Sequence, residues 1–199
     1  DASHAYCAAQ RPLHLVAQEG HANLVKVLLD AGAELDPPDE HGWTPLTHAV
    51  WMMGQPQVTA WEMPGTKNDR PVTFRIRHGL FVCVEDGLEL PMPIAAVRRL
   101  CAEHMPEHLR YLGRRDTAIK LLRLGADPNR AVDDGRTLLH LAAGLGEKTL
   151  FDALAKAIRE RHDDGKTALQ AAMARRDDLG RTVAHLAAGS RRPELVRRQ

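Results

Sequence analysis

The sequence is poor in aromatic residues, which make up 4% of its 199 positions. A core with so few large rings must be built mainly from Leu, Ala, Val and Ile. Such a composition favours packed helices over a sandwich of sheets. The hydrophobic content of 44% is nevertheless sufficient to bury a core, so disorder is not expected.

Cysteine is also scarce. Cys7, Cys83 and Cys101 cannot all pair with one another, and none of them belongs to a CxxC motif. We therefore expect reduced thiols in an intracellular, most simply cytoplasmic, protein. No apolar run reaches the roughly 18 residues of a membrane span, and no leader-like segment opens the chain, so no membrane contact is expected. Because the sequence starts at Asp1 without an initiator Met, we expect it to be a fragment of a longer protein.

Net charge is nearly absent, at +1, but it is unevenly distributed. Residues 1–69 carry three basic and nine acidic side chains, a balance of −6, whereas residues 159–199 carry ten basic and six acidic ones, a balance of +4. A nucleic-acid-binding protein shows a contiguous basic face, so a nucleic-acid partner is not expected. Ends of opposite charge can instead orient a protein partner during association.

Short phrases recur along the chain. The first kind combines an Asp/Gly turn with a Thr and a short apolar stretch: GWTPLTHAV at 42–50, GRTLLHLAA at 135–143, DDGKTALQAAM at 163–173 and DDLGRTVAHLAA at 177–188. The second kind is an apolar stretch that ends in Gly-Ala: LVKVLLDAGA at 24–33 and AIKLLRLGA at 118–126. Together they resemble the ankyrin repeat, whose signature is an Asp/Gly turn, T-P-L-H-x-A-A, G-H, an apolar helix and G-A-D-x-N. The resemblance covers residues 11–53 and about 116–199.

The resemblance implies a mainly α fold, an ankyrin-repeat helical solenoid of about four to five units within a single domain over residues 1–199. Each unit has a projecting turn, here called the finger, and two antiparallel helices. The residues expected to cap the first helices are Thr44, Thr137, Thr167 and Thr182. The residues expected to make the finger turns are Gly42, Gly135, Gly165 and Gly180. The histidines expected to brace the fingers are His14, His140 and His185.

An insertion interrupts the second repeat. Gly42 and Gly135 lie 93 residues apart, and subtracting one 33-residue period leaves 60, so the insertion spans about residues 54–115. We expect it between the two helices of that repeat. Apolar and polar residues alternate on either side of His78-Gly79, which predicts a β-hairpin over about 72–85. Helical spacing of apolar residues predicts helices over about 93–113.

The spacing near the C-terminus is too short. Gly165 and Gly180 are 15 residues apart, less than half a period, so the second helix of a fourth repeat has no room. Either that helix was lost or residues are missing between Arg175 and Asp178. A lost helix would expose the flank of its neighbour, which favours missing residues.

Two short motifs are typical of enzymes, but their context argues against catalysis. HMPEH at 104–108 matches the H-x-x-E-H pattern of zinc proteases. Pro106, however, disfavours the continuous helix that aligns both rings, and we expect one helix to end near Met105 and another to begin at Pro106. DGKT at 164–167 has Glu160 where a phosphate-binding loop requires Gly. We therefore expect no catalytic residue, no metal, no cofactor and no small-molecule substrate.

The resemblance implies a non-catalytic module that binds a protein partner on the concave surface formed by the fingers and first helices. The residues expected on that surface are Gln18, Glu19, Glu40, His41, Trp43, Trp51, Met52, Asp133, Asp134, Arg136 and Leu145. Trp51 either contacts the partner or packs under the insertion. Arg75 and Arg77, on the polar face of the hairpin, are expected to face an acidic or phosphorylated segment of the partner.

Two other hypotheses remain open. The chain is alternatively the substrate-targeting ankyrin tail of a multidomain enzyme, such as a bacterial effector delivered into a host cytosol, with the catalytic domain N-terminal to Asp1. A self-contained enzyme built around the insertion is the third hypothesis.

Overall fold

The computed structural model describes residues 10–54, 61–67, 70–77, 80–85, 88–91, 106–132 and 134–190. The chain divides into two compact units, one formed by residues 1–55 and 111–199 and the other by residues 56–110. We call them the helical unit and the sheet unit, and each is described by itself.

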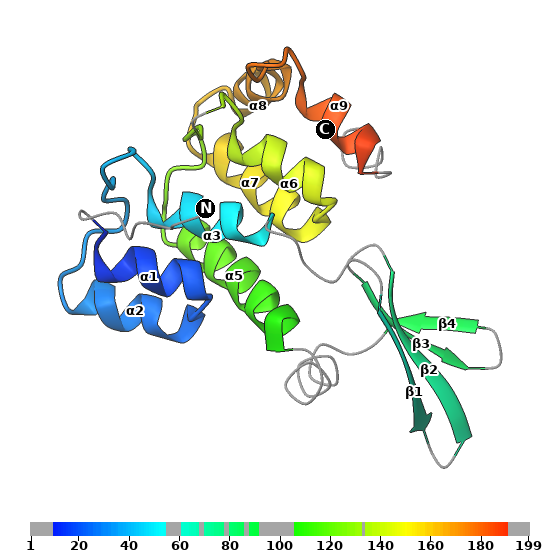
Figure 1. Cartoon of the computed structure of the whole chain (residues 1–199). Coiled ribbons are helices and arrows are strands. Elements are labelled where there is room, and N and C mark those ends of the chain that lie inside the picture. The colour runs from blue at the N-terminus through cyan, green and yellow to red at the C-terminus, as the bar shows by residue number, and fades with distance from the viewer. Residues whose placement is uncertain are drawn as a thin grey trace, which may run out of the picture. The chain divides into compact units, whose positions relative to one another are not determined.

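The helices are α1 (Pro12–Glu19), α2 (Ala22–Asp30), α3 (Pro45–Met53), α5 (Pro106–Arg123), α6 (Leu138–Leu145), α7 (Lys148–Glu160), α8 (Gly165–Ala174) and α9 (Val183–Gly189). Helix α1 packs on α3, α3 on α6, and α6 on α9, which gives a row of first helices (Figure 1). Helices α2 and α7 pack against α1 and α6 as second helices. The mainly α solenoid predicted from the sequence is confirmed.

Small apolar residues allow the first helices to approach one another. Ala49, Ala142 and Ala187 each lie five residues after the Thr of their repeat, and all three are completely buried. Larger residues of the same helices, such as Leu46 and Leu139, are buried as well. Because one repeat cannot bury this face alone, stacking is what stabilises each unit.

The expected caps and turns are present in the second and third repeats. The Thr44 hydroxyl accepts a hydrogen bond from the Thr47 amide at 3.4 Å, and Pro45 occupies the first helical position. Gly42 and Gly135 adopt φ values of 75° and 72°, the left-handed region in which Gly is favoured.

Histidines link each first helix to the finger that follows. His14 Nδ1 accepts from its own repeat's Arg11 amide at 3.0 Å, so the ring proton resides on Nε2, which lies 3.1 Å from the Trp43 carbonyl oxygen. His140 repeats the arrangement, with Nε2 at 3.1 Å from the Arg175 carbonyl oxygen. These two rings therefore brace the next finger, as the resemblance implied.

The segment DDGKTALQAAM does not begin a repeat, and the expected roles of Gly165 and Thr167 are wrong. Gly165 is the first residue of α8, and the Thr167 amide donates to the capping carboxylate of Asp164 at 3.2 Å. A Cβ on Gly165 would lie 2.4 Å from the Arg159 carbonyl oxygen, so Gly permits α8 to fold back closely on α7. Sequence alone does not reveal this approach, because a finger turn requires the same Gly.

The fourth finger stacks directly on the third. The Asp178 amide donates to the Asp134 carbonyl oxygen at 3.1 Å, and α9 packs on α6. Thr137 and Thr182 are 45 residues apart, 12 more than a 33-residue period, and α8 has 10 residues. Helix α8 is therefore an extra helix of the third unit. The stack is continuous without further residues between Arg175 and Asp178.

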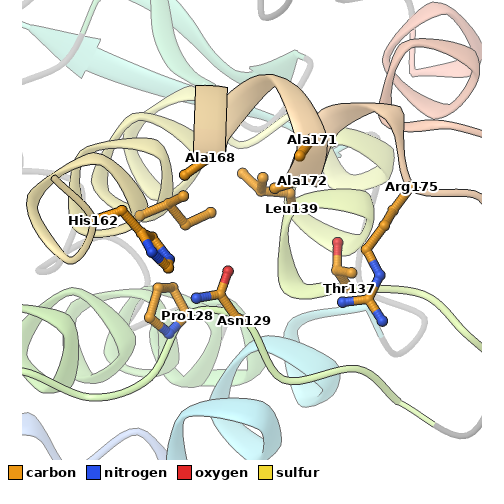
Figure 2. A pocket seen from close by; sticks show the side chains of 10 residues that line it. Pro128, Asn129, Thr137, Leu139, His162, Ala168, Ala171, Ala172 and Arg175 are labelled. Carbon is orange, nitrogen blue, oxygen red and sulfur yellow. The ribbon is translucent and has the colours of Figure 1, made fainter. Parts of the chain in front are cut away.

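Helix α8 also lines an open pocket of about 470 Å³ together with α6, α7 and the loop at Pro128-Asn129 (Figure 2). Ala168, Ala171 and Ala172 are its contributions to the lining.

Helix α5 serves as the second helix of the second repeat. The buried Arg114 donates from Nε to the Gln18 carbonyl oxygen at 2.6 Å and from Nη1 to the Met52 carbonyl oxygen at 3.1 Å. The Tyr111 hydroxyl donates to Glu147 Oε1 at 2.6 Å. Helix α5 therefore ties the ends of α1 and α3 to the beginning of α7.

The sheet unit contains an antiparallel sheet with the strand order β1-β2-β3-β4. The strands are β1 (Trp61–Lys67), β2 (Arg70–Arg77), β3 (Leu80–Glu85) and β4 (Leu88–Pro91). Strands β2 and β3 correspond to the expected hairpin, whereas β1 and β4 were not expected. Both additional strands lie at edges of the sheet, where Pro64 and Pro91 are tolerated.

The helices expected over about 93–113 are only partly within the described residues, which resume at Pro106. Helix α5 is described from Pro106 and continues without interruption to Arg123. The expected end of the insertion near Arg115 therefore falls inside a single helix. None of the described helices is long and apolar enough to cross a membrane.

Candidate functional site

The second finger is held by one buried carboxylate. Asp39 Oδ1 accepts from the amides of His41 at 2.9 Å and Trp43 at 2.8 Å, while its Oδ2 lies 2.8 Å from His48 Nε2. These three contacts fix the backbone that carries Trp43. A short acidic side chain at the start of a turn commonly bonds the amides that follow it in this way.

The Asp39–His48 pair has a defined protonation state. Burial disfavours the charged form of Asp39, but hydrogen bonds from His48 and from the two amides outweigh this effect and lower the carboxyl pKa. Burial lowers the pKa of His48 despite the neighbouring carboxylate. At neutral pH a neutral His48 therefore donates its Nε2 proton to an ionised Asp39.

An aromatic cluster extends from this finger along α3. The Trp43 and Trp51 rings have centroids 5.2 Å apart at an interplanar angle of 61°, and Trp43 also contacts His48 edge-on at 5.4 Å. Both tryptophans are half-buried. The guanidinium carbon of Arg136, from the third finger, lies 5.2 Å from the Trp51 ring centroid. A cation in this position is attracted by the ring face. We call Trp43, Trp51 and Arg136 the tryptophan cluster.

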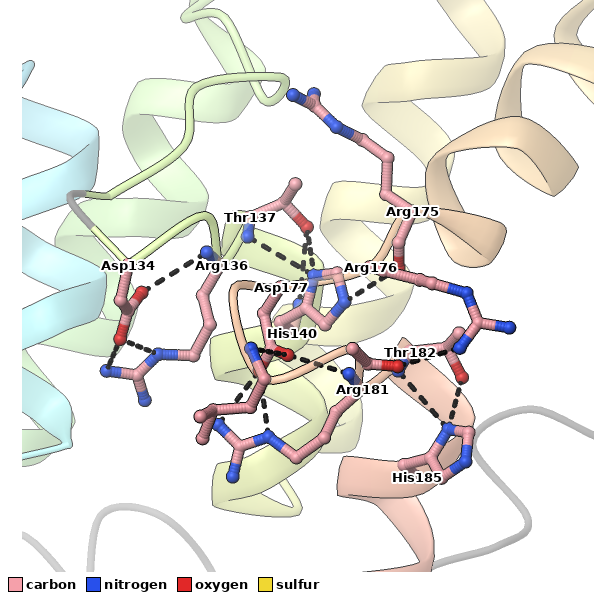
Figure 3. Close-up of polar contacts among 12 residues, drawn as sticks. Asp134, Arg136, Thr137, His140, Arg175, Arg176, Asp177, Arg181, Thr182 and His185 are labelled. Carbon is pink, nitrogen blue, oxygen red and sulfur yellow. Dashed lines mark hydrogen bonds and ion pairs between the residues drawn. The ribbon is translucent and has the colours of Figure 1, made fainter.

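Asp134 holds Arg136 in place. Arg136 Nε donates to Asp134 Oδ2 at 2.5 Å, and the Arg136 amide donates to Oδ1 at 3.2 Å (Figure 3). The bond from the Arg136 side chain is the main reason that the pKa of Asp134 is lowered. The carboxylate is thus ionised, and it fixes the cation beside Trp51.

The fourth finger also pairs an Asp with an Arg and adds an apolar tip. Asp177 accepts from the Arg181 amide at 2.7 Å and from Arg181 Nε at 2.8 Å. Leu179, at the tip, is 74% exposed, the most exposed large hydrophobic side chain among the described residues. We did not single out Leu179 from the sequence, although an apolar residue between Asp178 and Gly180 was a usable signal.

The other residues expected on the contact surface differ in their exposure. Glu40 and His41 are exposed at the tip of the second finger and lie within 3.7 Å of each other. Gln18, Glu19 and Met52 are half-buried at the C-terminal ends of α1 and α3, and Leu145 is half-buried at the end of α6. The structure thus joins Trp43, Trp51, Asp134 and Arg136 through direct contacts.

Three expected contact residues have no described side chain. Asp133 is outside the described residues. Arg75 and Arg77 belong to β2, but only their backbone is described. They are paired with Val82 and Leu80 of β3 and, being two residues apart, lie on the same side of the strand.

The metal-binding motif is not described as a whole, because His104 precedes Pro106. In the part of the chain that the structure describes, no group of three or more His, Cys, Asp and Glu side chains is placed to hold a metal ion. The described cysteine, Cys83, is buried and free.

The family model of ankyrin repeats in three copies matches residues 2–61 and 109–198. The chain belongs to the ankyrin-repeat family. The match leaves out residues 62–108, which include all but the first residue of the sheet. Ankyrin repeats are protein–protein interaction modules without catalysis of their own, so this ankyrin domain is a protein-binding module.

One curated relative extends the comparison. The ankyrin domain is 33% identical over 134 residues to the E3 ubiquitin-protein ligase KEG of Arabidopsis thaliana. The alignment covers 67% of this chain but only 7% of the relative. The likeness therefore concerns the repeats of a much larger protein.

Proposed function

We propose that the partner binds along the fingers and first helices of the second to fourth repeats, with the tryptophan cluster at the centre. The cluster supports this proposal because it combines two half-buried indole rings and a fixed guanidinium on adjacent repeats. Trp and Arg are the residues most often found at interface hot spots. A partner that covers both rings gains apolar contact without ordering new side chains.

The charged groups around the cluster contribute orientation more than affinity. Asp39 is paired with His48, and Asp134 with Arg136, within the domain. Partner charges therefore compete with bonds that already exist. The exposed Leu179 offers a second apolar contact on the fourth finger. The partner segment in this proposal is mainly apolar where it meets the fingers.

An acidic region elsewhere in the partner is a separate part of the proposal. Arg75 and Arg77 place two positive charges on the same side of β2. Charges near an interface mainly accelerate association rather than prolong the complex. We also place the protein inside the cell, where the free thiol of Cys83 remains reduced.

Site-specific photo-crosslinking tests where the partner binds. A photoreactive amino acid at His41, on the exposed second finger, should capture the partner. The same amino acid at Lys156, whose side chain is 72% exposed on α7, is the control. Mass spectrometry then identifies the captured protein. Capture from position 156 but not from position 41 would place the interface on the second helices and refute the proposal.

A second candidate function is substrate recognition within a larger enzyme. The relative's name, E3 ubiquitin-protein ligase, supports it. In this case the full-length protein modifies the captured partner, and Trp43→Ala in the full-length protein reduces that modification. A full-length protein without a catalytic domain would eliminate this candidate and leave the binding module unaffected.

A further inference from the structure

The pocket beneath α8 has a floor and two walls of different chemistry. Leu139 and Ile158, each 1% exposed, form the apolar floor. One wall is the small-residue face of α8, with Ala168 and Ala172, and the loop that contains Asn129 lies opposite it (Figure 2). The volume of about 470 Å³ is within the range of ligand sites, which is about 300–1,000 Å³.

Three polar side chains of the lining have no polar partner among the described residues. The side chains of Asn129, His162 and Arg175 make no hydrogen bond or ion pair with any residue that the structure describes. The backbone at Arg175 is held, because its carbonyl oxygen is bonded to His140 Nε2 at 3.1 Å, while Arg175 itself is exposed beside the pocket. In Figure 2, Arg175 and His162 lie on opposite sides of the pocket.

The charged side chain in the pocket lining is positive. No acidic side chain lines the pocket, whereas Arg175 does. A guanidinium presents a planar fork of donors that matches a carboxylate. The buried Leu139 and Ile158 side chains, by contrast, favour an aliphatic group. The ligand that fits is therefore an aliphatic group joined to a carboxylate.

We propose that this pocket binds the free C-terminus of a protein partner whose last residue is aliphatic. The α-carboxylate would pair with Arg175, the last side chain would lie on Leu139 and Ile158, and the preceding peptide group would meet the amide of Asn129. A C-terminal residue presents these three groups together. The pocket is separate from the tryptophan cluster, so this proposal does not depend on the finger surface.

Methyl NMR of the whole chain tests the proposal with defined probes. The tripeptide acetyl-Ala-Ala-Leu with a free carboxyl group should shift the Leu139 and Ile158 methyl signals. The same peptide with a C-terminal amide should bind at least about tenfold more weakly, because it loses the charged bond to Arg175. Arg175→Gln should weaken the free acid similarly. Lys166→Gln, which removes an equal charge from α8 outside the pocket lining, should not.

A filling variant and a small acid complete the test. Ala172→Leu should abolish the shifts by occupying the pocket, while the other methyl signals report an intact fold. Equal binding of acid and amide, no effect of Arg175→Gln, or no shift with either peptide would overturn the proposal. If 4-methylpentanoate binds as tightly as the free tripeptide, the pocket is a site for small acids rather than for a chain end.

Discussion

Gly165→Ala should detach α8 from α7. A Cβ at this position would lie 2.4 Å from the Arg159 carbonyl oxygen and 2.8 Å from its Cα, whereas ordinary contact begins at 3.4 Å. The obstacle is backbone, which cannot rotate away as a flexible side chain does. Helix α8 must therefore move by about 1 Å or lose its packing on α7, in keeping with the low tolerance of close-packed interiors.

The expected loss of stability follows from Leu169. This side chain is 2% exposed and is the buried residue of α8. Exposing a Leu costs about 1.5–3 kcal/mol, and replacing Gly by Ala in a helix returns up to about 1 kcal/mol. Gly165→Ala should thus lower the free energy of unfolding by about 1–2 kcal/mol. For a chain of this size that corresponds to a melting temperature lower by about 2–8 °C.

Matched glycine variants test whether position 165 requires Gly because the backbone of α7 is close or because the residue adopts a left-handed conformation. A Cβ added to Gly144, inside α6, would meet no atom within 4 Å, so Gly144→Ala should be neutral or stabilising. Gly180 has a φ of 72° and open space around it, so Gly180→Asn should be tolerated, since Asn adopts the left-handed region. Gly165→Asn should be as harmful as Gly165→Ala. If Gly165→Asn melts at the temperature of the parent chain, the reasoning is refuted, and the expectation that Gly165 makes a finger turn is supported instead.

Three further predictions concern caps, pH and association. Thr137→Val should lower the free energy of unfolding by about 1 kcal/mol in urea denaturation. The Thr137 hydroxyl accepts from the His140 amide, and the His140 ring accepts from the Thr137 amide. Lowering the pH from about 7 to 5 should reduce stability, because burial lowers the pKa of His48 and of His140 and the unfolded chain binds protons first, near pH 6.5. Arg75→Glu should reduce the association rate with the partner, with an effect in stopped-flow measurements that shrinks as salt is added.

Each of these has a clear contrary result. An unchanged urea midpoint for Thr137→Val would show that the cap is dispensable. A stability that is constant between pH 7 and 5, or an equal pH dependence in His140→Gln, would contradict the assignment to buried histidines. An Arg75→Glu effect confined to the dissociation rate would place that residue within the contact itself.

Most of the repeat architecture could be predicted because its signals are local. Thr44 and Pro45 specify a helix start, and Gly42 specifies a turn, whatever surrounds them. The tertiary stack then follows from the need to cover an apolar face. The positions of the fingers were predictable for the same reason, since fingers occupy fixed positions in each repeat.

The sequence could not reveal which Gly-Lys-Thr or Gly-Arg-Thr phrase begins a repeat. Both Gly165 and Gly180 fit the pattern, and only the contact of Asp178 with Asp134 shows which finger stacks on the third. The edge strands could not be predicted from the sequence for another reason. Pro64 and Gly65 within β1 argue against a strand, yet an edge position tolerates them.

The candidate site was only partly predictable. Trp43 and Arg136 were identified from their repeat positions, but their connection through Trp51 depends on side-chain geometry across two repeats. The support of the second finger by Asp39 and His48 was missed, because these residues are nine positions apart and belong to different elements.

Titration calorimetry of the captured partner tests the central claim most directly. Trp43→Ala should weaken binding by about 2 kcal/mol or more, as truncation of an interface anchor does. Trp61→Ala, which changes the same residue type in β1, is the matched control and should bind with nearly the affinity of the parent chain. If Trp43→Ala remains folded by circular dichroism and binds as tightly as the parent, the tryptophan cluster is not the binding surface.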